Sequence, residues 1–387
     1  MTHALRPIRS VITALGPSGV LDAAVVVPAR NEQRRITACL DALVVAICKA
    51  RPLTTGIVVV INNTEDATSE RVLAWAAAHS DISLQVIDCT FLPQEAHVGA
   101  ARRLGLDHAL NHVVRDGILL TTDADSRVRP GWISRNHQAL SHADLICGAF
   151  AADKDEVRTL PPAVAMHCHI ETAYMSVAVK LAALLDPLPH DPDPPHLNAS
   201  GASLAFTRQL YETVGGMPVI AMSEDRAFAA RAERHDFRVR HCNRVMVDTS
   251  CRMTGRTGGG MAGALRERAV EADPQVDQWL EPADTFARRY QLRGRLRAAW
   301  PDSAALAGHL STALGPRDAT RLMRMALPQT FGAFSEHVEA NTAALARVRM
   351  RISDCRAELQ RLTDLHTAFS YLNQAFSVPQ DERRQAL

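Results

Sequence analysis

The sequence predicts an α/β fold, with a Rossmann-like, mixed but mainly parallel sheet flanked by helices and a helical appendage at its C-terminal end. β-Branched runs alternate with amphipathic helical patterns in the first half, as in parallel βαβ units. Polar turns follow these runs, and only helical patterns follow residue 281. We expect an extension over residues 1–22, a main domain over 23–280 and a helical region over 281–387.

Four strand-like runs organise the first half. The run "AAVVVPA" precedes the turn "RNEQRR" and the helical stretch "ITACLDALVVAICKA", and "GIVVVINNTEDATS" precedes "ERVLAWAAAH". The third run, "ISLQVIDC", precedes "HVGAARRLGLDHALNH", and the fourth, "DGILLTTDAD", ends at Asp123 and Asp125. Ligands of such sheets bind at the carboxyl ends of the strands. The turns "ARNE", "NNTEDAT" and "TDADS" fall there, so we expect them to share one site.

The character of the sequence changes from about Asp186. A loop rich in Pro, Asp and His comes first, "DPLPHDPDPPHLNASGASL". A short strand and helix follow, "GASLAFTRQLYETVGG", and then an acid-led helix and a final strand or two, "SEDRAFAARAERHDFRVRHCNRVMVDTS". The glycine-rich loop "CRMTGRTGGG" carries Arg252 and Arg256, whose forked donors suit phosphate oxygens. The alternative for this loop is a flexible basic segment without a ligand.

Composition narrows the classes of protein. A net charge of +1 gives no reason to expect a nucleic-acid partner. Eight cysteines without a CxxC pair indicate reduced thiols. The N-terminus has no signal-peptide pattern, and no apolar run reaches the ~20 residues of a membrane helix. The best candidate, residues 163–185, is interrupted by charged and His residues and predicts an amphipathic helix packed on the protein. We expect a cytoplasmic protein without a transmembrane segment.

Two acidic pairs have alternative explanations when each is considered alone. Asp123 and Asp125 suit Mg²⁺ or Mn²⁺, which take oxygen ligands, or they are solvated turn residues. Glu224 and Asp225 begin a predicted helix, where acids favour the helix dipole. Either acid could also take a proton from a reacting hydroxyl.

The order of the motifs resembles the inverting glycosyltransferase family 2, which has the GT-A fold. The motifs are "VVVPARNE", "VVVINNTEDAT", "GAARRLGLDHA", "TTDAD", "GASLAF...VGG" and "SEDRAFAARAERHDFRV", and they span roughly residues 23–250. The resemblance implies that residues 23–150 form a nucleotide-sugar-binding half and residues 151–280 an acceptor and catalytic half.

The resemblance also implies roles for individual residues. Asp225 or Glu224 would be the general base, Asp125 the firmer ligand of Mg²⁺ or Mn²⁺, and Asp123 a ligand nearer the ribose; a third metal ligand stays unassigned. Asn198, Ser200 and Gly201 would border the sugar and acceptor. The residues expected to bind the nucleotide sugar are Pro28, Arg30, Glu32, Asn62, Asn63, Arg102, Asp123, Asp125, Arg252 and Arg256. Asn62 and Asn63 replace the usual acidic pair, which leaves the base undetermined.

We therefore expect metal-dependent, inverting transfer of a sugar from a nucleotide-diphosphate sugar to a hydroxyl of a small-molecule or lipid-linked acceptor. A lipid-linked acceptor would place the enzyme at the inner membrane. A degenerate nucleotide-sugar-binding scaffold is the first alternative; the Asn62–Asn63 departure favours it, and the intact Asp125 and Asp225 disfavour it. A nucleotidyltransferase would carry a glycine-rich, lysine-containing signature after the first strand, which "VVVPARNEQRR" lacks. The basic C-terminal helices predict a solvated face or a homo-oligomer contact.

Overall fold

The computed structural model describes residues 7–255, 260–324 and 328–377. The chain forms two compact units that are interleaved in sequence. The first unit comprises Met1–Leu160, Asn198–Glu233 and Phe237–Glu267, and the second comprises Pro161–Leu197, Arg234–Asp236 and Arg268–Leu387. The boundaries expected at 22/23 and 280/281 stay predictions.

A mixed sheet of nine strands, counted within the described residues, forms the centre of the first unit, in the order β1-β4-β3-β2-β5-β8-β7-β9-β6. Parallel pairing joins β4, β3, β2 and β5, and also β7 with β9, whereas the other neighbours are antiparallel. The strands are β1 (Arg9–Leu15), β2 (Leu21–Ala29), β3 (Thr55–Asn62), β4 (Leu84–Thr90), β5 (Val113–Thr121), β6 (Ser126–Val128), β7 (Leu145–Ala152), β8 (Leu204–Thr207) and β9 (Val239–Thr249). The four runs predicted from sequence are β2 to β5.

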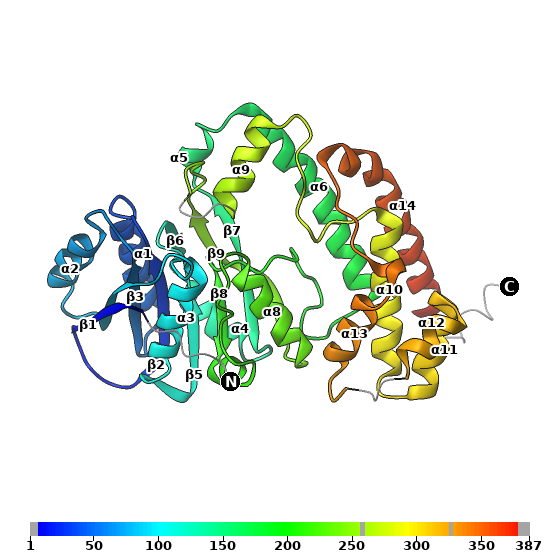
Figure 1. Cartoon of the computed structure of the whole chain (residues 1–387), viewed down its shortest axis with the longest axis horizontal. Coiled ribbons are helices and arrows are strands. Elements are labelled where there is room, and N and C mark those ends of the chain that lie inside the picture. Colours follow the sequence, from blue (N-terminus) through cyan, green and yellow to red (C-terminus); the bar gives the residue numbers. More distant parts are fainter. Residues whose placement is uncertain (1–6, 256–259, 325–327, 378–387) are drawn as a thin grey trace. The chain divides into compact units, whose positions relative to one another are not determined.

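Helices cover both faces of this sheet (Figure 1). Because successive strand residues point to opposite faces, Val25 and Val27 of β2 join one apolar core, and Ala24 and Val26 join the other. The first core includes side chains of α1 (Ile36–Ala50), α2 (Thr68–Ala78) and α4 (Trp132–Ala139), and the second includes side chains of α3 (Val98–Ala109), α7 (Arg208–Thr213) and α8 (Glu224–Arg234). The predicted mixed α/β class is confirmed.

The carboxyl ends of β2, β3 and β5 lie at one edge of the sheet, because these strands are parallel neighbours. β9 ends at the same edge, where the Ser250 amide donates to the Asp125 carbonyl oxygen at 3.2 Å. The predicted polar turns therefore meet at one edge, as the βαβ pattern indicated.

Strand β1 lies within the segment that we expected to be an N-terminal extension. It pairs antiparallel with β4 at the edge of the sheet. Its residues are largely exposed, including Val11 and Ile12. An exposed edge strand has no buried face, so the sequence shows none of the alternation that reveals a half-buried strand.

Helices make up most of the second unit, as predicted for the C-terminal region. They are α6 (Pro162–Leu185), α10 (Ala283–Ala299), α11 (Ser303–Leu314), α12 (Pro316–Leu322), α13 (Phe331–Ala340), the 3₁₀ turn η1 (Ala343–Leu345) and α14 (Ile352–Ser377). Tyr174, Phe286 and Leu362 bring α6, α10 and α14 into one apolar core. Two shorter helices, α5 (Lys154–Val157) and α9 (Met261–Val270), complete the described elements.

Helix α6 is the single described helix that is long and apolar enough to cross a membrane by length and composition. One such helix is weak evidence of a membrane span, and 28% of its most apolar window is buried inside the structure. In α6, Tyr174, Ala178 and Leu181 are buried in the unit's own core, and the Tyr174 hydroxyl donates to the Glu281 carbonyl oxygen at 2.7 Å.

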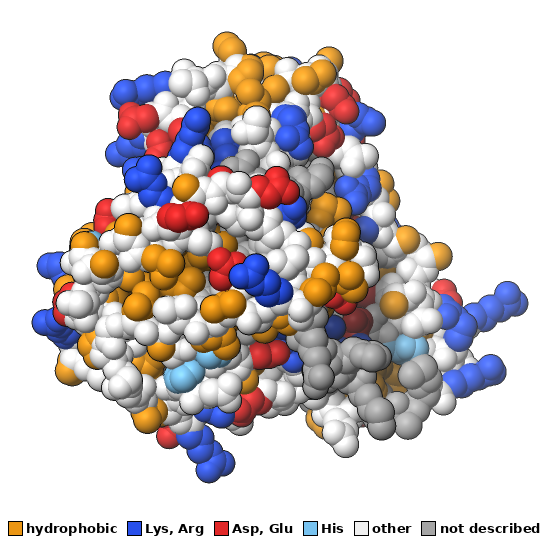
Figure 2. Space-filling model, turned by 60° about the vertical axis from the view of Figure 1, so that its left-hand side comes forward, with side chains coloured by type: hydrophobic (Ala, Val, Ile, Leu, Met, Phe, Trp, Pro, Cys, Tyr) orange, Lys and Arg blue, Asp and Glu red, His pale blue; other side chains and the backbone are white. Residues whose placement is uncertain are grey.

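On the face that Figure 2 shows, acidic and basic side chains are interspersed with apolar ones, consistent with the near-neutral net charge.

Candidate active site

The turn after β5 presents the two acids singled out from the sequence. Its backbone is fixed, because the Ser126 amide donates to the Asp123 carbonyl oxygen at 3.0 Å and the Ser250 amide to that of Asp125 at 3.2 Å. The Asp123 side chain is 36% exposed and that of Asp125 is 17% exposed. Both carboxylates therefore lie at the sheet edge and remain accessible.

Arg102 of α3 joins this turn to the start of α8. Its side chain is 2% exposed and donates from Nε to the Thr121 hydroxyl at 3.1 Å and from Nη2 to the Asp123 carboxylate at 2.6 Å. Its Nη1 donates to the Glu224 carboxylate, which is itself buried. One guanidinium thus connects acids that are 101 positions apart in the sequence.

The two acids that begin α8 have different surroundings. The Glu224 side chain is 4% exposed and is ion-paired with Arg102. Asp225 is half-buried, and its carboxylate accepts from the Gly201 amide at 2.7 Å and the Arg226 amide at 2.8 Å. Asp225 is therefore the more accessible acid of the pair, held by backbone donors.

Arg252, in the loop after β9, binds two of the predicted site acids. Its guanidinium donates to both carboxylate oxygens of Glu32, with 2.7 Å from Nη1 to Oε2, and lies 2.9 Å from the Asp125 carboxylate. The loop is tethered by Glu156, whose carboxylate accepts from the Ser250 hydroxyl at 2.6 Å and the Cys251 amide at 2.8 Å. Arg256 lies outside the described residues.

The acids influence one another's protonation. Burial raises the pKa of Asp125 to about 7, and the negative charge of Asp123 adds to this effect while Arg252 opposes it. Burial also raises the pKa of Asp123; Arg102 opposes the shift, and the charges of Asp225 and Glu32 add to it. The site therefore gathers carboxylates that a further cation would stabilise.

The residues expected to contact the nucleotide base lie at the ends of β2 and β3. Pro28 is buried within β2, and Arg30 donates to the Ala96 carbonyl oxygen at 3.0 Å. Asn63 exchanges two hydrogen bonds with the backbone of Phe91, at 2.9 and 3.0 Å. Asn62 is 3% exposed, and its Nδ2 has no hydrogen-bond partner among the residues that the structure describes. Asn62 is thus the residue of this pair with a donor still to be satisfied.

The segment expected to border the acceptor precedes β8. Asn198 and Ser200 are half-buried, and Gly201 is buried. The Gly201 amide donates to Asp225, so this segment contacts the accessible acid of α8.

Two of the site residues, Asp123 and Asp125, are suitable ligands for a divalent ion. Asp123 and Asp125 supply the carboxylate oxygens that Mg²⁺ and Mn²⁺ prefer. Among the described residues there is no cluster of three or more His, Cys, Asp or Glu side chains arranged to hold a metal. Both aspartates are ion-paired with arginines, so Arg252 would have to leave Asp125 when a metal binds there.

Some residues of this region escaped the sequence analysis. Thr121 orients Arg102, and Glu156 and Arg35, joined at 2.9 Å, support the Arg252 loop. Glu156 and Ser250 are 94 positions apart, and no local motif links them. Their contribution is visible only in three dimensions.

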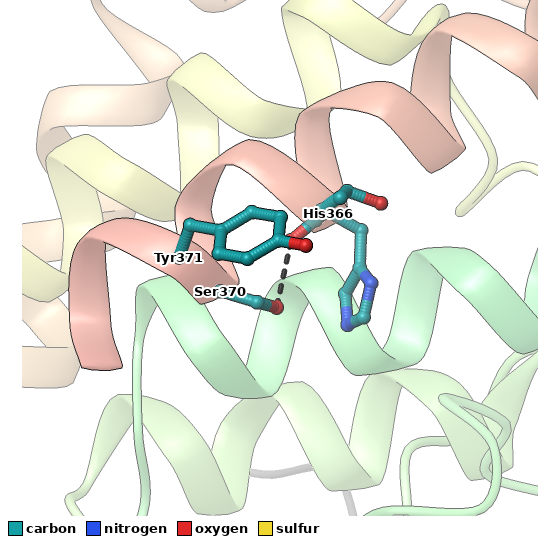
Figure 3. A pocket seen from close by; sticks show the side chains of 4 residues that line it. His366, Ser370 and Tyr371 are labelled. Atoms are coloured by element: carbon teal, nitrogen blue, oxygen red, sulfur yellow. Dashed lines mark hydrogen bonds between the residues drawn. The ribbon is translucent and has the colours of Figure 1, made fainter. Parts of the chain in front are cut away.

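The hollow drawn in Figure 3 lies on α14 and is lined by His366, Thr367, Ser370 and Tyr371. These residues come from one stretch of one helix, and the Ser370 hydroxyl donates to the His366 carbonyl oxygen at 2.8 Å. None of the predicted site residues lines this hollow.

Comparison with a protein-family model identifies the segment that carries the strands and the Asp123–Asp125 turn. Residues 24–190 match the model described as Glycosyl transferase family 2. This segment belongs to that family. The expected resemblance and the expected class of enzyme, a glycosyltransferase, are confirmed. The family 2 segment contains Glu32, Arg102 and the Asp123–Asp125 turn, whereas Asp225 and Arg252 lie beyond its match.

Solved structures resemble the chain at low identity. The mannosyltransferase PcManGT from Pyrobaculum calidifontis, in complex with GDP-Man and Mn²⁺, is 16% identical with a TM-score of 0.43, covering 96% of this chain and 85% of that one. TarS 1–349 of S. aureus with UDP-GlcNAc is 16% identical with a TM-score of 0.44, covering 91% and 92%. The glucosyl-3-phosphoglycerate synthase of Mycobacterium tuberculosis, with Mn²⁺, UDP and phosphoglyceric acid, is 14% identical with a TM-score of 0.39, covering 66% and 83%. No curated protein matches the chain.

Proposed function

We propose that the chain transfers a sugar from a nucleotide-diphosphate sugar to an acceptor hydroxyl, with inversion and with the help of Mg²⁺ or Mn²⁺. The observation that carries this proposal is the meeting of acids from the turn after β5 and from the start of α8. Asp123 and Asp125 follow β5, and Asp225 begins α8 directly after Glu224, which shares the guanidinium of Arg102 with Asp123. Family membership of residues 24–190 supports the class of reaction.

Asp225 is the residue that we assign as general base. Inverting transfer forms a bond from the acceptor oxygen to the anomeric carbon and breaks the bond from that carbon to the diphosphate. The acceptor hydroxyl loses its proton during the attack, and an accessible carboxylate can take it. Asp225 is half-buried and held by two backbone amides, which fix its carboxylate toward the Gly201 segment.

The leaving diphosphate requires positive charge. Arg252 has a forked guanidinium at the edge of the sheet, and such a group binds phosphate oxygens well. Asp123 and Asp125 would hold the divalent ion, which supplies charge stabilisation to the departing diphosphate when it is bound. Glu32 would keep Arg252 near these acids.

The donor and acceptor would bind at neighbouring parts of this edge. We assign the base of the nucleotide to the end of β3, where Asn62 has a buried, unsatisfied Nδ2 among the described residues. The acceptor hydroxyl belongs beside Gly201 and Ser200, because that segment contacts Asp225.

A thermal-shift screen of UDP-, GDP- and ADP-sugars, with and without Mn²⁺, tests the proposal. We expect one donor to raise the unfolding temperature only when the metal is present, because binding to the folded state stabilises it. Asp125→Ala should abolish the metal-dependent part of the shift. If no nucleotide sugar stabilises the chain in the presence of Mn²⁺, the proposal is wrong.

A further inference from the structure

We propose that Arg102 is a positioning residue that fixes the metal-side acid Asp123 and the start of α8 relative to each other, and that Glu224 is its counter-ion rather than a base. The part that concerns catalysis rests on the proposed function. The resemblance to family 2 implied a donor-binding role for Arg102, and the geometry of this chain points to a different one.

The donors of Arg102 are directed at protein groups. Nε donates to Thr121, Nη2 to Asp123 and Nη1 to Glu224. The side chain is 2% exposed, which leaves it little surface to offer a ligand. A guanidinium engaged on three sides in this way holds its partners in a fixed geometry.

Gly201 closes the remaining side of Arg102. A Cβ at position 201 would lie 2.4 Å from the Arg102 guanidinium carbon. The guanidinium is pinned by three partners, so it cannot easily give way. The same glycine donates its amide to Asp225, so Arg102 and Asp225 are positioned through one backbone segment.

Glu224 has the surroundings of a structural counter-ion. Its side chain is 4% exposed and ion-paired with a guanidinium that is also buried. A carboxylate in this setting is poorly placed to meet an acceptor hydroxyl from solvent. Its neighbour Asp225, bound only through backbone amides in the hydrogen bonds described above, keeps an accessible carboxylate.

The first test compares the stability of Arg102→Met with that of Arg102→Met/Glu224→Gln. The single variant leaves Glu224 buried and without its counter-ion, so we expect its unfolding temperature to fall on the order of 10 °C, or the protein to be insoluble. The double variant removes that buried charge and should recover a substantial part of the loss. If the double variant is no more stable than the single one, the counter-ion assignment is wrong. This comparison needs no substrate and is decisive even if the proposed function fails.

The control for this test is Arg238→Met in the same unit. Arg238 also forms a forked pair with a carboxylate, that of Asp144, at 2.9 and 3.0 Å, but its side chain is 48% exposed. Exposed pairs contribute little to stability. We therefore expect this variant to unfold within a few degrees of the wild type.

The second test compares Glu224→Gln with Asp225→Asn in a transfer or donor-hydrolysis assay with Mn²⁺. Gln keeps an oxygen that accepts from Arg102, so Glu224→Gln should retain activity within roughly tenfold and keep the acidic limb of the pH–rate profile. Asp225→Asn should lose about 10²- to 10⁴-fold. If folded Glu224→Gln loses as much as Asp225→Asn, Glu224 is a catalytic residue and the proposal is overturned.

The third test addresses donor binding directly. UDP and GDP, each with Mn²⁺, are titrated by calorimetry into the wild type and into Arg102→Met/Glu224→Gln. For the nucleotide that the wild type binds, we expect the dissociation constant to rise by no more than roughly tenfold, because Asp123 loses a positioning contact while Asp125 and Arg252 are unchanged. A loss of roughly a hundredfold or more, the effect of removing charge-assisted hydrogen bonds, would show that Arg102 contacts the diphosphate and would contradict the proposal. Failure of the wild type to bind either nucleotide would count against the proposed function instead.

Discussion

At the scale of single residues, the site is a set of carboxylates held by arginines. Asp125 shows the consequence for protonation, since its pKa is raised to about 7 from an ordinary value near 3.8. A raised pKa means that the folded state binds this proton more tightly than the unfolded chain does. The contribution of this group to stability is therefore complete below about pH 4 and is lost as the pH rises to about 7.

Asp125→Asn should remove this pH dependence. In metal-free buffer we expect the unfolding temperature of the variant, relative to the wild type, to rise between pH 4 and pH 7. Asp22→Asn is the control: hydrogen bonds from Thr54 lower the pKa of Asp22, so its stabilising effect is already complete above about pH 4. Thermal melts at four or five pH values distinguish the two, and curves for Asp125→Asn that run parallel to the wild type would contradict the assignment.

Arg252 should compete with a metal ion for Asp125. In Arg252→Met, Mn²⁺ alone should bind roughly tenfold more tightly, because a guanidinium 2.9 Å from Asp125 is gone. A nucleoside diphosphate should bind roughly tenfold more weakly in the presence of Mn²⁺, because the guanidinium that would donate hydrogen bonds to its phosphates is lost. The control is Arg129→Met, which removes a guanidinium that pairs with Asp248 at 2.8 Å rather than with Asp125. Both affinities should stay as in the wild type. Electron paramagnetic resonance of Mn²⁺ measures the first effect, and an unchanged affinity would sink this account of Arg252.

At the scale of elements, the close packing of α3 on the sheet is what places Arg102. Gly105 of α3 faces β2 and β3, and a Cβ there would lie 2.5 Å from Val26 Cγ1 and 2.7 Å from Val60 Cγ2. These valines are buried in strands and cannot move aside without disturbing the sheet. The glycine therefore sets the distance between the helix and the sheet.

Gly105→Ala should destabilise the first unit by about 1–3 kcal/mol through overpacking. Gly308, in α11, is the matched control, because a Cβ there meets nothing within 4 Å. Gly308→Ala should instead stabilise its unit by about 0.5–1 kcal/mol, since alanine is the better helix former. Chemical denaturation followed by circular dichroism measures both, and effects of the same sign would show that the packing argument is wrong.

The sequence predicted the four strands β2 to β5, whose apolar runs are followed by polar turns. It missed the exposed strand β1, and it also missed β7, although Leu145 and Ile146 of β7 are fully buried. The strands β2 to β5 are β-branched runs followed by polar turns, so their order and the edge at which they meet could be predicted. The exposed edge strand β1 has no such pattern. At the site, the acids could be predicted because they lie in local motifs. The pairings Arg102–Glu224 and Arg252–Glu32 could not, because they join residues 122 and 220 positions apart.

At the scale of the whole molecule, the two units are interleaved along the chain, so each is built from segments that are separated in sequence. Helix α6 follows the main strands in sequence, yet its Tyr174 and Leu181 share an apolar core with Phe286 of α10 and Leu362 of α14. The core of the second unit therefore depends on residues on both sides of position 280.

A chain truncated after residue 280, where sequence patterns placed a domain boundary, should fold poorly. The truncation removes α10 and α14 and exposes the apolar side chains of α6 that they cover. We expect aggregation during size-exclusion chromatography, whereas the full-length chain should remain monodisperse. A soluble, cooperatively folded 1–280 fragment would contradict this description of the second unit.

The central claim is that the acids gathered at one edge of the sheet carry out glycosyl transfer. The most direct measurement is the release of nucleoside diphosphate from nucleotide sugars by the wild type, Asp125→Asn and Asp225→Asn, with Mn²⁺ and with EDTA. We predict release by the wild type only with the metal, and losses of about 10²- to 10⁴-fold in Asp225→Asn. Release that persists in EDTA, or that is equal in the wild type and folded Asp225→Asn, would contradict the account.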